Sequence, residues 1–216
     1  MDTVTFILVL LAAAVPAYFL GSINGAIITS KHLFRKDIRK YGSGNPGITN
    51  FYRVFGKAGA LLVLFIDISK SILPTIFGGF LFYTFFDMMI FGRVATGLFV
   101  MLGHCFPVYY KFKGGKGVMA AGGIIFVVDW RVALVCWAVF LLVVFLSRYI
   151  SLGSMIGALT FPATILLFSL GGHWEVIIAA MCTILLVVRH QANIKRLIAG
   201  TESRFSFKGQ STNRKS

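Results

Sequence analysis

Long apolar runs separated by short polar segments make up most of the 216-residue chain. A membrane-spanning helix needs about 20 apolar residues, and fewer where protein surrounds it. The pattern predicts an all-α integral membrane protein, a compact bundle of seven transmembrane helices, two of them short. We expect these spans near residues 4–29, 58–86, 89–110, 118–128, 132–147, 149–170 and 176–188.

Polar residues inside two of the runs indicate helix faces that do not contact lipid. Ser22 and Asn24 stand in the first run beside Gly21, and small and polar residues of this kind mark helix–helix contacts. Asp67 and Lys70 are three residues apart in the second run, so they share a face and can form an ion pair. Charges inside a membrane are costly, and the pair is compatible with either a functional or a purely structural role.

The composition supports a membrane protein with one domain. The chain is 57% hydrophobic and 13% charged, with mean hydropathy +0.85, whereas about a quarter of a soluble domain is charged. The net charge of +14 could indicate nucleic acid, but the aromatic residues lie in the apolar runs and not among the basic ones, so no nucleic-acid partner is expected. We expect a transmembrane domain over 1–205 and a basic, disordered tail over 206–216.

The distribution of charge predicts the orientation. If the N-terminus lies outside and all runs cross, 18 of the 21 Lys and Arg residues face the cytoplasm, and Asp2, Asp87, Asp129 and Glu175 face outward. This agrees with the excess of basic residues in cytoplasmic loops, so the C-terminus should be cytoplasmic. A five-span alternative, in which 118–147 does not cross twice, leaves the same segments on the same sides. The first run is too long for a signal peptide and lacks a basic flank, so it should be retained.

Three polar segments then face the cytoplasm together: 42–53, 112–117 and 189–196. The first reads Gly-Ser-Gly-Asn-Pro-Gly-Ile-Thr-Asn and ends at Arg53, and the second contains Lys-Gly-Gly-Lys-Gly. Backbone N–H groups of glycine-rich turns form concave sites for anions, and Lys and Arg add cationic donors for phosphate. The pattern predicts a membrane enzyme or a transporter that acts on phosphorylated compounds, without deciding between them.

Other site types fit the sequence less well. Residues 42–47 match GxGxxG, but a dinucleotide site needs a preceding strand and a following helix, and here membrane spans flank the segment. The H-x4-D spacing of His32 and Asp37 resembles the catalytic pair of the large acyltransferase family that uses acyl-CoA or acyl-carrier protein. The two residues lie among basic residues, however, and a solvated or headgroup-facing role is expected. No His, Cys, Asp or Glu set has metal-ligand spacing, so neither a metal nor another cofactor is expected.

The three segments together resemble the bacterial membrane glycerol-3-phosphate acyltransferase family that uses acyl phosphate. The matching stretches are Gly-Ser-Gly-Asn-Pro-Gly-Ile-Thr-Asn-x-x-Arg (42–53), Gly-His-x-Phe-Pro-x-x-x-x-Phe-Lys-Gly-Gly-Lys-Gly-Val (103–118) and Val-Arg-His-x-x-Asn-Ile-x-Arg-Leu-x-x-Gly-x-Glu (188–202). The likeness covers nearly the whole chain, in order and spacing.

The resemblance implies the first step of phosphatidic acid and phospholipid synthesis at the bacterial cytoplasmic membrane. Acyl phosphate and sn-glycerol 3-phosphate would give 1-acyl-sn-glycerol 3-phosphate (lysophosphatidate) and phosphate, at a site that faces the cytoplasm. The donor is already activated, so no covalent enzyme intermediate is needed. The implied partners are these two substrates, the lipid bilayer and the soluble enzyme that makes acyl phosphate.

The resemblance also implies roles for individual residues. Ser43 and Arg53 would bind the donor phosphate, Lys116 would bridge phosphate and oxyanion, and His190 and Asn193 would position glycerol 3-phosphate. A substrate phosphate oxygen would accept the hydroxyl proton, with His190 as the competing base. The remaining expected substrate contacts are Gly42, Gly44, Asn45, Gly47, Thr49, Asn50, His104, Lys113, Gly114, Gly115 and Arg196.

Overall fold

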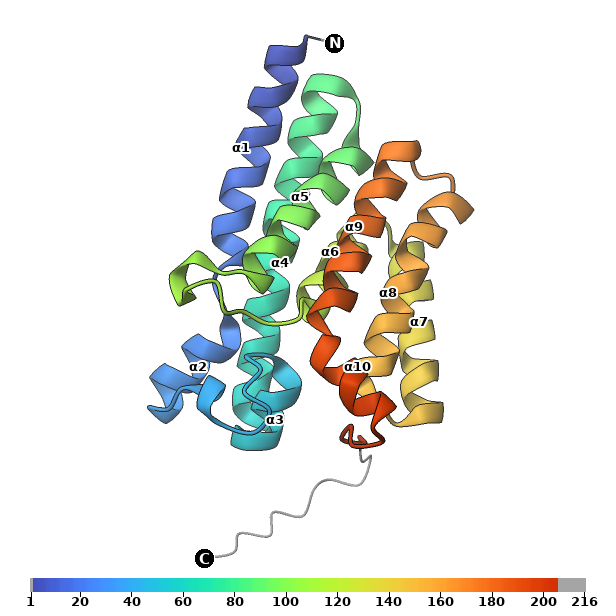
Figure 1. Ribbon diagram of the computed structural model, residues 1–216. Helices are drawn as coiled ribbons and strands as arrows, with labels where there is room; N and C mark the ends of the chain where they lie inside the picture. Colours follow the sequence, from blue (N-terminus) through green and yellow to red (C-terminus); the bar gives the residue numbers. More distant parts are fainter. Residues whose placement is uncertain (1, 206–216) are drawn as a thin grey trace, which may run out of the picture.

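The described part of the protein, residues 2–205 of a computed structural model, is a helical bundle without strands. Its order is α1 (Thr3–Gly21), α2 (Gly25–Phe34), α3 (Ile48–Phe55), α4 (Lys57–Phe86), α5 (Met89–Cys105), α6 (Val118–Val128), α7 (Trp130–Ser147), α8 (Ile150–Leu167), α9 (His173–Arg189) and α10 (Gln191–Ile198) (Figure 1). Short 3-10 turns lie at Ile38–Lys40 and Val108–Tyr110. The all-α prediction is confirmed, and the expected disordered tail lies outside the described residues.

Five helical stretches of the described chain are long and apolar enough to cross a membrane. They are Thr3–Phe34, Lys57–Phe86, Met89–Tyr110, Trp130–Ser147 and Ile150–Leu167, and the pair α9–α10, bent by 58°, would be a sixth. Helix α6 has 11 residues, about 16 Å at 1.5 Å per residue, which is roughly half of the ~30 Å apolar layer. Seven crossings and their orientation therefore remain predictions.

The first expected span contains a break that the hydropathy pattern conceals. Helix α1 ends at Gly21, and α2 begins at Gly25 after Asn24, whose side chain accepts a hydrogen bond from the Ile27 N–H at 2.9 Å. Gly21 packs directly on the backbone of Val100 in α5, where a Cβ would clash. An N-cap side chain accepts a hydrogen bond from a free N–H group at the start of a helix. Asn24 therefore allows α2 to begin inside the protein.

A buried ion pair joins this break to the centre of the bundle. Lys70 Nζ lies 2.9 Å from Asp67 Oδ1, and their side chains are 4% and 1% exposed. The same ammonium donates to the Ile23 carbonyl and to Nδ1 of His104 at 2.9 Å, while Asp67 accepts from the Gly25 N–H at 3.1 Å. All three donors of Lys70 are thus used, as a charge buried in a membrane requires.

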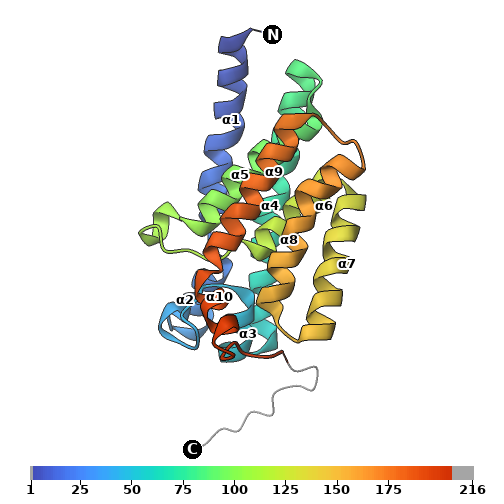
Figure 2. The ribbon, with the colours of Figure 1, turned by 45° about the vertical axis from the view of Figure 1, so that its right-hand side comes forward.

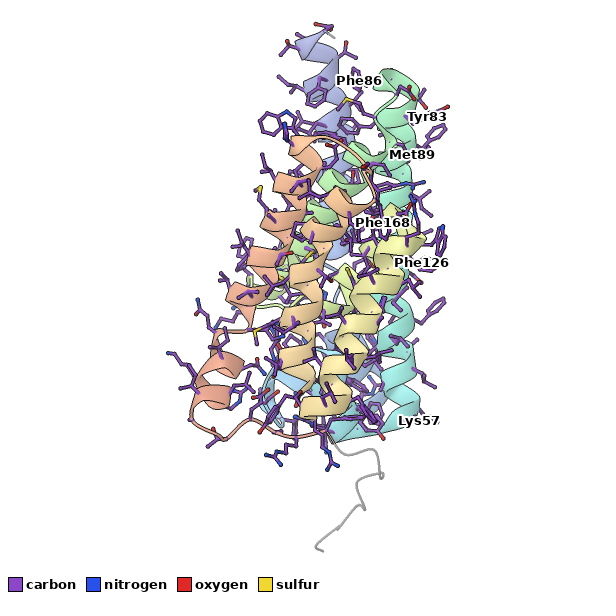
Figure 3. All side chains as sticks on the ribbon, turned by 90° about the vertical axis from the view of Figure 1, so that its right-hand side faces the viewer. Lys57, Tyr83, Phe86, Met89, Phe126 and Phe168 are labelled. Atoms are coloured by element: carbon purple, nitrogen blue, oxygen red, sulfur yellow. The ribbon has the colours of Figure 1, made fainter. Side chains whose placement is uncertain are left out.

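The helices near the polar segments gather at one end of the bundle, which we call the basic end. Figures 1 and 2 show α2, α3 and α10 side by side there, with the start of α1 at the opposite end. Figure 3 places Lys57 at the basic end and Tyr83, Phe86 and Met89 at the other. One apolar core is formed mainly by α5 to α9, and another by α2, α3, α4 and the 3-10 turn at Ile38–Lys40.

Candidate active site

A cavity of about 780 Å³ opens among α3, α4, the starts of α6 and α8, α7 and the α9–α10 bend. Its wall combines polar groups of the three predicted segments with apolar side chains of the bundle. The residues that line it include Gly42, Ser43, Asn45, Gly47, Thr49, Asn50, Arg53, Leu64, Asp67, His104, Lys116, Val118, Trp137, Phe140, Ser151, Ser154, His190, Asn193, Arg196 and Glu202.

The first polar segment folds into a loop that is held by Asn50. Asn50 Oδ1 accepts the Ser43 N–H at 2.9 Å, and its Nδ2 donates to the Tyr41 carbonyl at 3.0 Å. Gly42 has φ +57°, and a Cβ there would collide with Asn50 Oδ1. Only glycine adopts this backbone at little cost while leaving room for the amide. These contacts fix Ser43 at the cavity wall. The Asn50 side chain therefore positions Ser43, through its hydrogen bond to the Ser43 N–H.

Helix α3 continues the same wall. A hydrogen bond of 3.2 Å from Asn24 Nδ2 to the Pro46 carbonyl ties the loop to the α1–α2 break. Thr49 and Arg53 are four residues apart in α3 and share a face, and both line the cavity. Within residues 2–205, Arg53 forms no ion pair with a carboxylate. Its guanidinium is therefore available to an anion in the cavity.

The second polar segment is held by Arg189, which donates from Nε to the Gly115 carbonyl at 3.1 Å and from Nη2 to the Gly114 carbonyl at 3.0 Å. Gly115 packs on the ring of His104 and Gly114 on the His104 carbonyl, so neither position has room for a Cβ. The Asp67–Lys70 pair holds His104 in turn. These contacts present Lys116 to the cavity.

Lys116 is a half-buried cation among other cations. Burial, together with the charges of Arg196, Arg53 and Arg189 and against the opposing charge of Glu202, lowers the pKa of Lys116 to about 8. Burial disfavours the charged form of a lysine, and neighbouring positive charges add to that effect. An anion bound in the cavity would stabilise the ammonium.

The third polar segment turns at His190, between α9 and α10. His190 is 1% exposed, and its Nδ1 lies 2.8 Å from the Leu186 carbonyl oxygen. Because a carbonyl can only accept, Nδ1 carries a proton, and Nε2 of the neutral ring is an acceptor. Asn193, one turn further on, donates from Nδ2 to Glu202 at 2.6 Å, while its buried Oδ1 has no partner in the described structure.

Glu202 organises this part of the wall. Its Oε1 accepts from Ser151 Oγ and Asn193 Nδ2, both at 2.6 Å, and its Oε2 accepts from Arg196 Nε at 2.7 Å. Burial alone would raise the pKa of Glu202, but the hydrogen bonds from Ser151, Asn193 and Arg196 hold it below its usual value. A single carboxylate thus joins α8 to α10.

The structure brings together most of the residues that the sequence singled out. Ser43, Arg53, Lys116, His190 and Asn193 all line the cavity. Of the other expected contacts, Gly42, Asn45, Gly47, Thr49, Asn50, His104 and Arg196 line it as well, whereas Gly44, Lys113, Gly114 and Gly115 do not.

Several lining residues received no site role from the sequence. Trp137, Phe140, Ser151 and Ser154 come from runs that looked like plain spans, and no sequence signal sets them apart. Glu202 is the last residue of the third matching segment (188–202), and its place in that segment is the one sequence feature that indicates a role in the site. His32 and Asp37 lie outside the cavity, and Asp37 is bound by Arg39 at 2.6 Å. Within residues 2–205, no group of three or more His, Cys, Asp or Glu residues could hold a metal ion.

Known proteins match the chain over nearly its whole length. The profile of the glycerol-3-phosphate acyltransferase family matches residues 11–200. The glycerol-3-phosphate acyltransferase of Macrococcus caseolyticus is 39% identical over 89% of this chain and 95% of its own. That of Syntrophotalea carbinolica is 40% identical over 93% of this chain and 98% of its own.

Two crystal structures have the same fold. Both are described as PlsY (YgiH), an integral membrane glycerol 3-phosphate acyltransferase. The glycerol 3-phosphate form is 36% identical, with a TM-score of 0.82 over 91% of this chain and 96% of that one. The lysophosphatidic acid form is 34% identical, with a TM-score of 0.80 over 91% and 95%. The chain therefore belongs to the glycerol-3-phosphate acyltransferase family, as an integral membrane protein.

Proposed function

We propose that the protein transfers an acyl group from acyl phosphate to sn-glycerol 3-phosphate, giving 1-acyl-sn-glycerol 3-phosphate and phosphate. The observation that carries this proposal is the cavity itself, in which Ser43, Arg53, Lys116, His190 and Asn193 meet from three distant segments. The glycerol 3-phosphate and lysophosphatidic acid forms of the PlsY structures support this acceptor and product.

Charge in the cavity fits a reaction between two anions. Donor and acceptor each carry a phosphate, so the site must offset their repulsion before the reacting atoms can approach. Arg53 and Lys116 line the cavity without carboxylate partners in the described structure. We assign the donor phosphate to Ser43, Arg53 and the N–H groups of the glycine loop, and the space between the two phosphates to Lys116.

Polar groups on the opposite wall fit the glycerol part of the acceptor. A buried polar atom without a partner costs about 1–3 kcal/mol, and Asn193 Oδ1 is such an atom. A glycerol hydroxyl can donate to it, and the second hydroxyl can donate to His190 Nε2. Arg196 uses its Nε for Glu202, and its terminal N–H groups can bind the acceptor phosphate.

The reaction then needs no covalent intermediate between substrate and protein. The acceptor hydroxyl oxygen attacks the acyl carbon, a C–O ester bond forms, and the C–O bond to the phosphate breaks with its electron pair. The proton passes to an oxygen of the departing phosphate, which leaves as inorganic phosphate. Lys116 stabilises the oxyanion on the acyl carbonyl, where a preorganised donor has its greatest effect.

The apolar wall offers a place for the acyl chain. Leu64, Val118, Trp137 and Phe140 line the cavity on the α4, α6 and α7 side. Val118, Trp137 and Phe140 also line a smaller apolar space of about 60 Å³ that continues between α6, α7, α8 and α9. We propose that the acyl chain reaches the site from the bilayer along this wall.

The basic end is proposed to face the cytoplasm of a bacterial inner membrane. It carries the basic segments 31–57 and 189–204, in agreement with the usual bias of cytoplasmic loops. Acyl phosphate would then come from a soluble enzyme on the same side, and contact with that enzyme stays a prediction. No observation favours the transporter alternative.

The donor assignment is tested with purified protein in lipid nanodiscs, glycerol 3-phosphate and one of three donors of equal chain length. Acyl phosphate should support lysophosphatidate formation, while acyl-CoA and acyl-carrier protein should not. Formation from acyl-CoA at a comparable rate would refute the donor assignment and leave the acceptor unaffected. Ser43→Ala protein serves as the control for uncatalysed transfer.

A further inference from the structure

A second cavity adjoins the active site at the basic end, and we call it the annex. It has a volume of about 310 Å³ and shares Ile48, Thr49, Arg53 and Ile150 with the larger cavity. Its other lining residues come from α3, from the first two turns of α4 and from the chain after α10. They are Tyr52, Lys57, Ala60, Leu61, Arg204 and Phe205.

The annex has cationic groups and no acidic one. Arg53, Lys57 and Arg204 line it, no carboxylate does, and none of the three forms an ion pair within the described residues. Arg204 donates from Nε to the Tyr149 hydroxyl at 3.2 Å, which leaves its charge uncompensated. Lys57 begins α4, whose N-terminus has no side-chain cap. The free N–H groups and the helix dipole at this end add to the attraction for an anion.

One wall of the annex is apolar and continues onto the lipid-facing surface of α4. Leu61 stands one turn beyond Lys57 and is 56% exposed. Helix α4 has 30 residues, about 45 Å at 1.5 Å per residue, which exceeds the ~30 Å apolar layer. Its first turn, marked by Lys57 in Figure 3, therefore lies near the headgroups, and Leu61 lies closer to the acyl chains. The annex is therefore complementary to a single-chain amphiphile with an anionic head.

We propose that the annex is a second binding site for single-chain phosphate amphiphiles as they pass between the active site and the bilayer. Its cations would hold the phosphate head, and Leu61 and the lipid face of α4 would guide the chain. Both acyl phosphate on entry and lysophosphatidate on release have this chemistry. The inference rests on the proposed function, because only that reaction supplies such ligands to the adjoining cavity.

The test compares two double variants with the same change in net charge. Lys57→Gln with Arg204→Gln removes two annex cations and leaves the shared Arg53 in place. Arg35→Gln with Lys40→Gln removes two exposed cations that do not line the annex. Each protein is placed in nanodiscs of uncharged lipid, and four values are measured: the KM for acyl phosphate, the inhibition constant of a 16-carbon lysophosphatidate, the KM for glycerol 3-phosphate and the thermal unfolding midpoint.

The annex variant should weaken lysophosphatidate inhibition by roughly tenfold, the effect expected from two partly exposed charge contacts. A parallel rise in the KM for acyl phosphate would show that the donor also enters there, and an unchanged KM would assign the annex to product release. The KM for glycerol 3-phosphate and the unfolding midpoint should stay as in the wild type. Unchanged lysophosphatidate inhibition, an equal effect of the control variant, or an equal rise in the KM for glycerol 3-phosphate would overturn the proposal.

Binding of the same lysophosphatidate is also measured without turnover, through its effect on the unfolding midpoint. The active site is intact in the annex variant and still binds the lipid, so a smaller stabilisation in the annex variant, but not in the control variant, supports the second site, and equal stabilisation in both overturns it. If wild-type protein bound the lipid at the annex but released no phosphate from acyl phosphate, the proposed function would fail while the binding site stood.

Discussion

The charge of Lys116 should determine how the enzyme responds to alkaline pH. Burial and the neighbouring arginines lower the pKa of this side chain to about 8, from 10.5 for an ordinary lysine. The ammonium is the form that attracts phosphate and stabilises an oxyanion, so activity is lost as pH rises through this value. kcat/KM reports groups of the free enzyme, and it should fall about tenfold per pH unit above pH ~8. Two bound phosphates favour the cation, so the corresponding fall in kcat should lie at higher pH.

The assay follows initial phosphate release between about pH 6.5 and 10, with spontaneous hydrolysis of acyl phosphate subtracted. In Lys116→Arg protein the guanidinium stays charged over this range, so the residual kcat/KM should show no fall near pH 8. A wild-type kcat/KM that stays level up to about pH 10 would refute the pKa argument. A fall near pH 8 that persisted in Lys116→Arg would assign it to another group.

Two further substitutions test supports of the site, and a third tests the alternative His32–Asp37 pair. Gly42→Ala forces an alanine into a left-handed backbone at about 1–2 kcal/mol and displaces Asn50, so kcat/KM should drop by at least tenfold, whereas a wild-type rate would show that this amide contact is dispensable. Asp67→Asn leaves the Lys70 ammonium buried beside a neutral group, and the unfolding midpoint should fall strongly, since breaking a buried pair costs about 3–5 kcal/mol; adding Lys70→Met should restore part of the loss. Asp37→Asn removes only a partly exposed pair at the protein surface, worth about 0–1 kcal/mol, and should leave both activity and midpoint nearly unchanged; loss of most activity would instead revive the His32–Asp37 pair.

The bundle and the members of the site could be read from the sequence because both have local signals. Apolar runs of the length of a bilayer predict helices almost independently of context. Glycine-rich segments with Arg53, Lys116 and His190 stand out against such runs. The charge bias then places the three segments on one side of the membrane, where the structure has them lining one cavity.

The supports of the site had no such signal because they depend on contacts between distant segments. The break after Gly21 could be seen only as small and polar residues, since its cause is a close approach to α5 and a cap by Asn24. Asn50 resembled a substrate ligand, yet both ends of its amide are engaged by the loop backbone. Glu202 lies far along the chain from Ser151, and only the fold shows that they are bonded.

The most direct test of the active-site assignment is phosphate release by the purified protein in nanodiscs. We expect release that requires both acyl phosphate and glycerol 3-phosphate, with one lysophosphatidate formed per phosphate. Ser43→Ala and Arg53→Ala should each abolish this release while the thermal unfolding midpoint stays near that of the wild type. Release that is independent of glycerol 3-phosphate, or full activity in either variant, would contradict the assignment of this cavity as the active site.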